Sequence, residues 1–135
     1  MHHRHILRVG SVNRASGYVL ENIYNYKLQI CALVPCFGFV FGERDFERDT
    51  RSIVILGDTS DPSAIRPLAQ NPDVLVHEST LAYIPPIGEK NLQKYAPNVI
   101  HEKAVKRGHS TAEMAGQFAK SINARILALN HFSAR

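Results

Sequence analysis

The stretch that decides the fold is IVILGDTSDP, residues 53–62. Residues 53–56 form a continuous apolar run, which is typical of a strand that is buried on both faces, as in parallel sheets. The run ends at Gly57, and the acidic residue Asp58 follows directly. An acidic side chain at the end of a buried strand suggests a binding site there, provided that other strands end in a similar way.

Two further apolar runs also end in polar side chains. Residues 74–76 lead into His77 and Glu78, and a strand predicted at 125–129 leads into Asn130 and His131. The carboxyl ends of parallel strands meet at one edge of a sheet, and ligands of α/β proteins gather beyond that edge. If the strands are parallel, we therefore expect these polar groups to lie close together.

A well-capped helix is predicted between the last two of these strands. Residues 110–113 have the form of a capping box with Ser110 as the N-cap, and apolar residues follow at helical spacing. His109 directly precedes this cap, where the helix dipole attracts anions such as phosphate. This histidine is therefore expected to join the same edge.

The remaining chain completes an α/β pattern. The first half predicts strands at 17–21, 26–34 and 37–41, with a polar loop at 42–52. A short helix is expected from Pro62, with Asp61 as its cap and Pro67 limiting its length, and an irregular excursion is expected at 83–97. Alternating strands and helices favour a layered α/β domain, and 135 residues are the length of about one domain.

Composition limits the possible environments and partners. The net charge of +4 is compatible with a polyanionic partner without requiring one, and the tight basic cluster of Lys103, Lys106 and Arg107 also fits a solvated helix face. No window approaches 18 uninterrupted apolar residues, so no membrane span is expected. The start lacks a secretory pattern, and the pair Cys31 and Cys36 is expected to be reduced. These features favour an intracellular protein, in the cytoplasm, the nucleus or an organelle.

The residue types at the predicted edge suit metal-assisted hydrolysis. Asp and His side chains at strand ends offer oxygen and nitrogen ligands for zinc, and a carboxylate can bridge two metal ions. The His109 imidazole is placed to assist protonation of a leaving oxygen, particularly if Glu78 fixes its tautomer. Structural roles are the alternatives: Asp58 as a turn residue, and His77 or His131 as structural histidines. Convergence of all these groups on one edge favours the functional interpretation.

Four ordered motifs resemble the C-terminal motifs of tRNase Z, the 3′-processing endonuclease of precursor tRNA. They are ILGDTSDP, DVLVHESTLA, RGHSTAEMAGQFAKSI and LNHFSAR. The resemblance covers residues 53–135 and implies an α/β chain with part of the metallo-β-lactamase fold, the C-terminal half of its αβ/βα sandwich. Residues 1–135 are accordingly expected to form a single, incomplete metallo-β-lactamase-like domain.

The resemblance also implies roles for individual residues. Asp58 is similar to the carboxylate that bridges the two zinc ions of the family, and His131 to the final histidine ligand of the second zinc. Glu78 and His109 match the acid and the imidazole that act together near the scissile phosphate, with His77 in a supporting role. The implied reaction is hydrolysis of a phosphodiester just 3′ of the discriminator nucleotide of precursor tRNA. The family commonly forms homodimers.

One motif of the family has no counterpart here. The His-x-His-x-Asp-His metal motif is approached only by His3-Arg4-His5, and Leu7 and Arg8 stand where Asp and His should follow. The isolated chain is therefore expected to hold an incomplete metal site, to be inactive and poorly stable, and to expose an apolar sheet face. Two alternatives remain open: a non-catalytic subunit or pseudoenzyme that binds RNA or a partner, and another phosphodiesterase of the metallo-β-lactamase fold.

Overall fold

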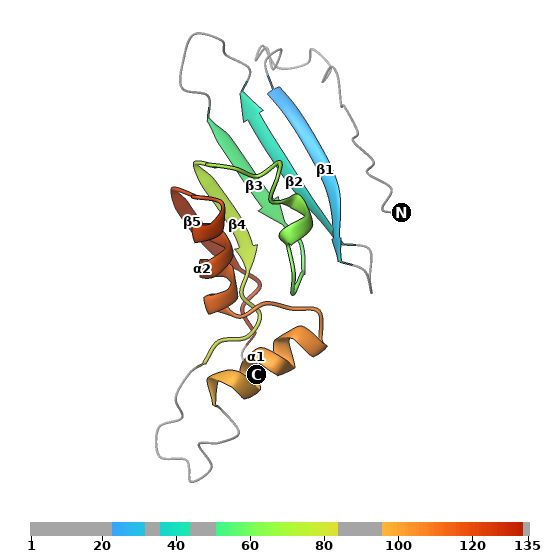
Figure 1. Cartoon of the computed structure of the whole chain (residues 1–135), viewed down its shortest axis with the longest axis vertical. Helices are drawn as coiled ribbons and strands as arrows, with labels where there is room; N and C mark the ends of the chain where they lie inside the picture. The colour runs from blue at the N-terminus through green and yellow to red at the C-terminus, as the bar shows by residue number, and fades with distance from the viewer. Residues whose placement is uncertain (1–22, 32–35, 44–50, 84–95, 134–135) are drawn as a thin grey trace.

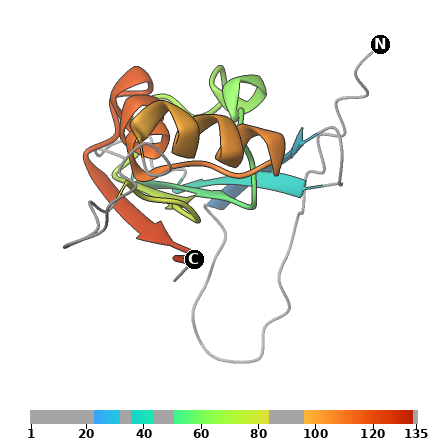
Figure 2. The same ribbon diagram turned by 90° about the horizontal axis from the view of Figure 1, so that it is seen from below.

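A single mixed sheet with helices on one face forms the described part of the chain (Figure 1 and Figure 2). The computed structural model describes residues 23–31, 36–43, 51–83 and 96–133. The sheet has five strands in the order β1-β2-β3-β4-β5. The strand predicted at 17–21, the His3-Arg4-His5 sequence and most of the excursion at 83–97 lie outside these ranges.

The strands follow the predicted order, with their ends shifted by a few residues. They are β1 (Ile23–Cys31), β2 (Cys36–Glu43), β3 (Ser52–Leu56), β4 (Val74–Glu78) and β5 (Ile126–Asn130). The first three are joined in antiparallel fashion, whereas β3, β4 and β5 are parallel. The parallel arrangement on which the predicted site depends is thus confirmed.

Three helical elements connect the parallel strands: η1 (Ser63–Ile65), α1 (Pro97–Lys106) and α2 (Ala112–Ser121). The short helix after Pro62 is a single 3-10 turn, and the Asp61 carboxylate accepts a hydrogen bond from the Ser63 N–H at 2.9 Å. Helix α1 was not predicted from the sequence. This helix begins with Pro97 at its first position and packs Ile100 and Ala104 against Leu81.

The predicted N-cap of α2 is wrong by one residue. Thr111, not Ser110, is the N-cap, and its hydroxyl accepts a hydrogen bond from the Met114 N–H at 3.2 Å. Ser110 is engaged elsewhere, because its hydroxyl donates to the Thr59 carbonyl oxygen and its N–H to Glu78. A tertiary contact therefore displaces the start of the helix.

The two faces of the sheet differ in their cover. Val40, Val54 and Leu75 lie opposite one another on adjacent strands and are buried under the helices, which Figure 2 shows on one side only. The neighbouring row faces away, so that Ile53 and Ile126 are 42% and 51% exposed. The expected apolar sheet face is present. Among the described helices, none has the length and apolarity needed to cross a bilayer.

Candidate functional site

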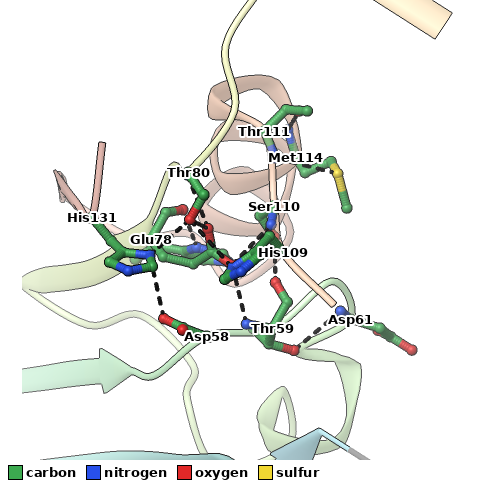
Figure 3. A network of polar contacts seen from close by, with 11 residues as sticks. Asp58, Thr59, Asp61, Glu78, Thr80, His109, Ser110, Thr111, Met114 and His131 are labelled. Atoms are coloured by element: carbon green, nitrogen blue, oxygen red, sulfur yellow. Dashed lines mark hydrogen bonds and ion pairs between the residues drawn. The ribbon is translucent and has the colours of Figure 1, made fainter. Parts of the chain in front are cut away.

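Three side chains from distant parts of the sequence meet at the carboxyl edge of the parallel strands (Figure 3). Asp58 follows β3, His109 precedes α2, and His131 directly follows β5. One ligand atom from each residue lies within 4.8 Å of the other two. Asp58 and His131 are also close as a pair, with 3.5 Å between Oδ1 and Nδ1, and both side chains are about half exposed.

Backbone pairing continues beyond the strands and fixes the position of His131. The Ser79 N–H donates to the Asn130 carbonyl oxygen at 2.9 Å, and the Ser133 N–H donates to that of Thr80 at 3.2 Å. Between these bonds His131 adopts a left-handed φ of 56°, a conformation that histidine enters more readily than most residues. The chain thus turns at His131, and its imidazole faces Asp58 and Thr80 (Figure 3).

Glu78 lies beneath these ligands as a fully buried acceptor of hydrogen bonds. Its Oε1 accepts from the N–H groups of Thr59 and Ser110, at 3.2 and 2.9 Å, and lies 3.1 Å from the His109 Nδ1. Its Oε2 accepts from both the N–H and the hydroxyl of Thr80, at 2.9 and 2.6 Å. Only 1% of the Glu78 side chain is exposed, so its carboxylate is bonded to protein groups, His109 among them, rather than to solvent.

This environment keeps Glu78 ionised. Burial by itself would raise the pKa of the Glu78 carboxyl, but the hydrogen bonds from Thr80, Ser110 and Thr59 outweigh it and hold the pKa below its ordinary value. An ionised carboxylate only accepts hydrogen bonds, so the His109 Nδ1 must be the donor to it.

His77 is adjacent to Glu78 in sequence but lies in the core. Its Nδ1–H donates to the Glu78 carbonyl oxygen at 2.7 Å, and its ring packs edge-on against Phe118 with 6.0 Å between centroids. Burial lowers the pKa of His77, and the hydrogen bond to Glu78 and the Glu78 charge offset this only in part. His77 is therefore neutral and takes no part in the metal-capable cluster.

Thr80 is a site residue that was not predicted from the sequence. Its Oγ1 lies 2.7 Å from the His131 Nδ1 and 3.3 Å from the His109 Nδ1, and the two rings are 5.5 Å apart. The signal in the sequence is the hydroxyl pair of Ser79 and Thr80 directly after Glu78, at the strand end where apolar residues stop.

An open pocket of about 450 Å³ adjoins the two imidazoles. Its lining comprises Thr80, Leu81, Arg107, His109, His131, Phe132 and Ser133. The Phe132 side chain is 70% exposed. The volume is within the usual range for small-ligand sites. The pocket therefore gives a ligand access to the metal-capable edge.

The donor set fits zinc. Zinc in proteins takes imidazole nitrogen and carboxylate oxygen ligands, and the cluster offers two imidazoles and one carboxylate. Asp58 and His131, the two ligands expected from the sequence, are both members. His109, expected to act on a leaving oxygen, lies close enough to be a third member. The exposed His101 on α1 is not part of the cluster.

Solved structures define the class of fold. The metallo-β-lactamase fold protein YhfI from Bacillus subtilis matches 87% of this chain, and 40% of its own length, with a TM-score of 0.60 at 18% identity. The short form of human tRNase Z matches 88% of this chain, and 39% of its own length, with a TM-score of 0.63 at 31% identity. The chain thus has part of a metallo-β-lactamase fold, as predicted.

Curated proteins with similar sequences are ribonuclease Z enzymes. The ribonuclease Z of Brevibacillus brevis is 37% identical over 103 residues, which are 73% of this chain and 27% of the relative. The ribonuclease Z of Limosilactobacillus reuteri is 44% identical over 85 residues, which are 63% of this chain and 23% of that relative. No model of a protein family matches. The resemblance to ribonuclease Z is confirmed, and the chain spans about a quarter of the length of these relatives.

Proposed function

We propose that this chain forms the C-terminal part of a zinc-dependent endoribonuclease that removes the 3′ trailer of precursor tRNA. The observation that carries the proposal is the convergence of Asp58, His109 and His131 above the ionised Glu78. The similarity to ribonuclease Z supports the choice of reaction and substrate.

Asp58 and His131 are the proposed zinc ligands, whereas His109, which lies in the same cluster, is assigned to proton transfer. Zinc held there would supply a Lewis acid for the phosphodiester and would lower the pKa of water. Both proposed ligands are half exposed, so a cation and an RNA phosphate can reach them without displacing protein groups.

His109 and Glu78 divide the proton chemistry between them. The Glu78 carboxylate accepts the His109 Nδ1–H, which leaves Nε2 as the atom that gains or gives up a proton. His109 is therefore the proposed donor of a proton to the leaving oxygen. Glu78 is buried and acts through His109, so its role is to hold the ring in position.

The pocket beside the imidazoles suits an unpaired nucleotide. The exposed Phe132 ring provides a surface on which a base can stack, as in many single-strand RNA sites. Arg107, on the same pocket, offers a guanidinium to a phosphate. Both contacts tolerate different sequences, which suits trailers that differ among tRNA precursors.

A graft tests the proposed reaction. Residues 53–135 would replace the matching segment of the Limosilactobacillus reuteri ribonuclease Z, and a 3′-extended precursor tRNA would be incubated with zinc. We expect cleavage just after the discriminator nucleotide, with a loss of at least about 100-fold in rate on Asp58→Ala or His131→Ala, as for other essential site groups. The matched control is His101→Ala, which should leave the rate unchanged. A graft that folds and binds zinc but does not cleave would contradict the proposal.

The purified 135-residue chain tests the expected incompleteness of the site. We propose that it binds fewer than two zinc ions and does not cleave the same RNA by itself. Metal analysis with two zinc ions per chain and robust cleavage would refute this part of the proposal. A homodimer, as is common in the family, is proposed as well, and light scattering of the purified chain measures it directly.

A further inference from the structure

The Thr80 hydroxyl lies at the centre of the site and has three polar partners. Its Oγ1 lies 2.6 Å from the Glu78 Oε2, 2.7 Å from the His131 Nδ1 and 3.3 Å from the His109 Nδ1 (Figure 3). A hydroxyl has one hydrogen to donate and two lone pairs with which to accept. Only one of the three partners can therefore receive the hydrogen.

Glu78 receives it. A carboxylate that accepts bonds from the N–H groups of Thr59, Thr80 and Ser110 is ionised and has no hydrogen to give. At 2.6 Å the contact has the length of a strong O–H···O⁻ bond, so the hydrogen lies between Thr80 and Glu78. The lone pairs of the Thr80 oxygen are then left for the two imidazoles.

Both ring nitrogens that contact Thr80 must consequently carry hydrogen. For His131, the alternative acceptor is the Asp58 Oδ1 at 3.5 Å, which is too long for a good hydrogen bond, whereas Thr80 lies at 2.7 Å. For His109, the Nδ1–H lies between the Glu78 Oε1 at 3.1 Å and the Thr80 Oγ1 at 3.3 Å. Each neutral ring then has its lone pair on Nε2.

The backbone holds this hydroxyl in place without help from a metal ion. The Thr80 N–H donates to the Glu78 Oε2 at 2.9 Å, and its carbonyl oxygen accepts from the Ser133 N–H at 3.2 Å. The second bond ties Thr80 to the segment that carries His131. The separation between the hydroxyl and the His131 ring is therefore set by the fold.

We propose that Thr80 is a positioning residue whose hydroxyl fixes the Nδ1–H tautomer of His131, while Glu78 fixes that of His109, so that both neutral rings present Nε2 as the lone-pair atom. The Glu78 carboxylate thus supports two imidazoles, His109 by direct contact and His131 through the Thr80 hydroxyl. Such support of the second ring nitrogen raises the basicity of a metal-binding histidine. The proposal rests on the proposed function only in taking Nε2 as the atom that meets zinc or substrate.

The two histidines should respond differently when the hydroxyl is removed. Thr80→Val keeps the branched shape and deletes the oxygen. His109 retains its direct bond to Glu78, whereas His131 is left with the more distant Asp58. We therefore expect His131 to become a mixture of tautomers and His109 to stay in the Nδ1–H form.

Nitrogen NMR of the imidazole rings in the metal-free 135-residue chain, at about pH 8 where histidine is neutral, measures this directly. The wild type and Thr80→Ser should show Nδ1–H tautomers for both rings, and Thr80→Val should lose this state at His131 alone. The matched control is Ser121→Ala, which removes a hydroxyl bonded to Phe118 at the far end of α2. A Nε2–H tautomer of His131 in the wild type would overturn the proposal, and this reading requires no variant to fold.

Zinc affinity, measured by competition with a fluorescent chelator, provides the second readout. Thr80→Val should weaken zinc binding about 10- to 100-fold, the usual effect of losing a partner of a metal-bound histidine, and Thr80→Ser should stay within about threefold. Equal affinities and unchanged tautomers in a folded Thr80→Val chain would refute the role of Thr80. If the tautomers are as expected but the graft does not cleave precursor tRNA, the proposed function fails and the role of Thr80 stands.

Discussion

The two halves of the site are built in opposite ways. The lower half, centred on Glu78, is buried and each oxygen of its carboxylate accepts at least two hydrogen bonds. The upper half carries Asp58 and His131, which are 45% and 51% exposed. The chain thus supplies all the hydrogen bonds of the Glu78 carboxylate, and it leaves the proposed ligand atoms of Asp58 and His131 open to solvent.

Physical chemistry explains this contrast. A buried carboxylate is stable only when hydrogen bonds replace the water it has lost, so Glu78 requires all its partners in the folded chain. Ligand atoms have the opposite need, because their lone pairs must stay available for a cation. We therefore expect the stability of the chain to depend on the groups around Glu78, and the proposed metal binding to depend on Asp58 and His131.

The largest effect is expected for Glu78→Ala. The buried N–H groups of Thr59, Ser110 and Thr80 would lose their acceptor, which should lower the free energy of unfolding by about 3–5 kcal/mol. Chemical denaturation measures the loss. Glu102→Ala, on the exposed face of α1, is the matched control and should stay within about 0.5 kcal/mol. A loss for Glu78→Ala below about 1 kcal/mol would contradict a stabilising role for the hydrogen bonds that Glu78 accepts.

Asp58→Asn and His131→Ala should impair zinc binding and leave the stability of the chain unchanged. Each should weaken zinc binding about 100-fold, or about 2.7 kcal/mol, while the metal-free chain keeps its stability within about 0.5 kcal/mol because both side chains are half exposed. Calorimetric titration with zinc and denaturation without zinc give the two values. His101→Ala serves as the control for removal of an exposed imidazole. Unchanged zinc binding in both variants would remove them from the proposed ligand set.

Acidification should weaken the chain through His77. Its pKa in the fold is lower than the ordinary value of 6.5, so the unfolded chain binds the proton more tightly. The contribution of neutral His77 to stability is complete above pH 6.5 and is lost as the pH falls below it. For one proton, the free energy of unfolding then falls by at most about 1.4 kcal/mol per pH unit. His77→Asn should remove this part of the slope. Denaturation of both chains between about pH 8 and pH 5 measures it, and identical slopes would show that His77 is not the group responsible.

The smallest effect is expected on the open face of the sheet. Ile126→Thr preserves β-branching at a half-exposed position and should change the free energy of unfolding by less than about 1 kcal/mol. Val54→Thr, at a position with 0% exposure, is the buried counterpart and should cost about 1–3 kcal/mol because its hydroxyl finds no water. A larger loss for Ile126→Thr than for Val54→Thr would mean that the open face is covered in solution.

The sequence alone was enough to predict three buried strands and the polar residues at their ends. Apolar runs identify β3, β4 and β5, and the expectation that Asp58, Glu78 and His131 share an edge holds because the structure pairs these strands in parallel. His109 followed from its position before a helix. The motifs also pointed to the ribonuclease Z resemblance that the comparisons confirm.

Tertiary structure alone decided how these groups are held. The local pattern favours Ser110 as the cap, but its hydroxyl donates to the Thr59 carbonyl oxygen and its N–H to Glu78, so Thr111 caps the helix instead. Similarly, His77 and Glu78 are both polar residues at the end of one strand. Packing against Phe118 makes the first a neutral core residue, while donors from three segments keep the second ionised. Such contacts join residues far apart in sequence, so no local pattern of residues encodes them.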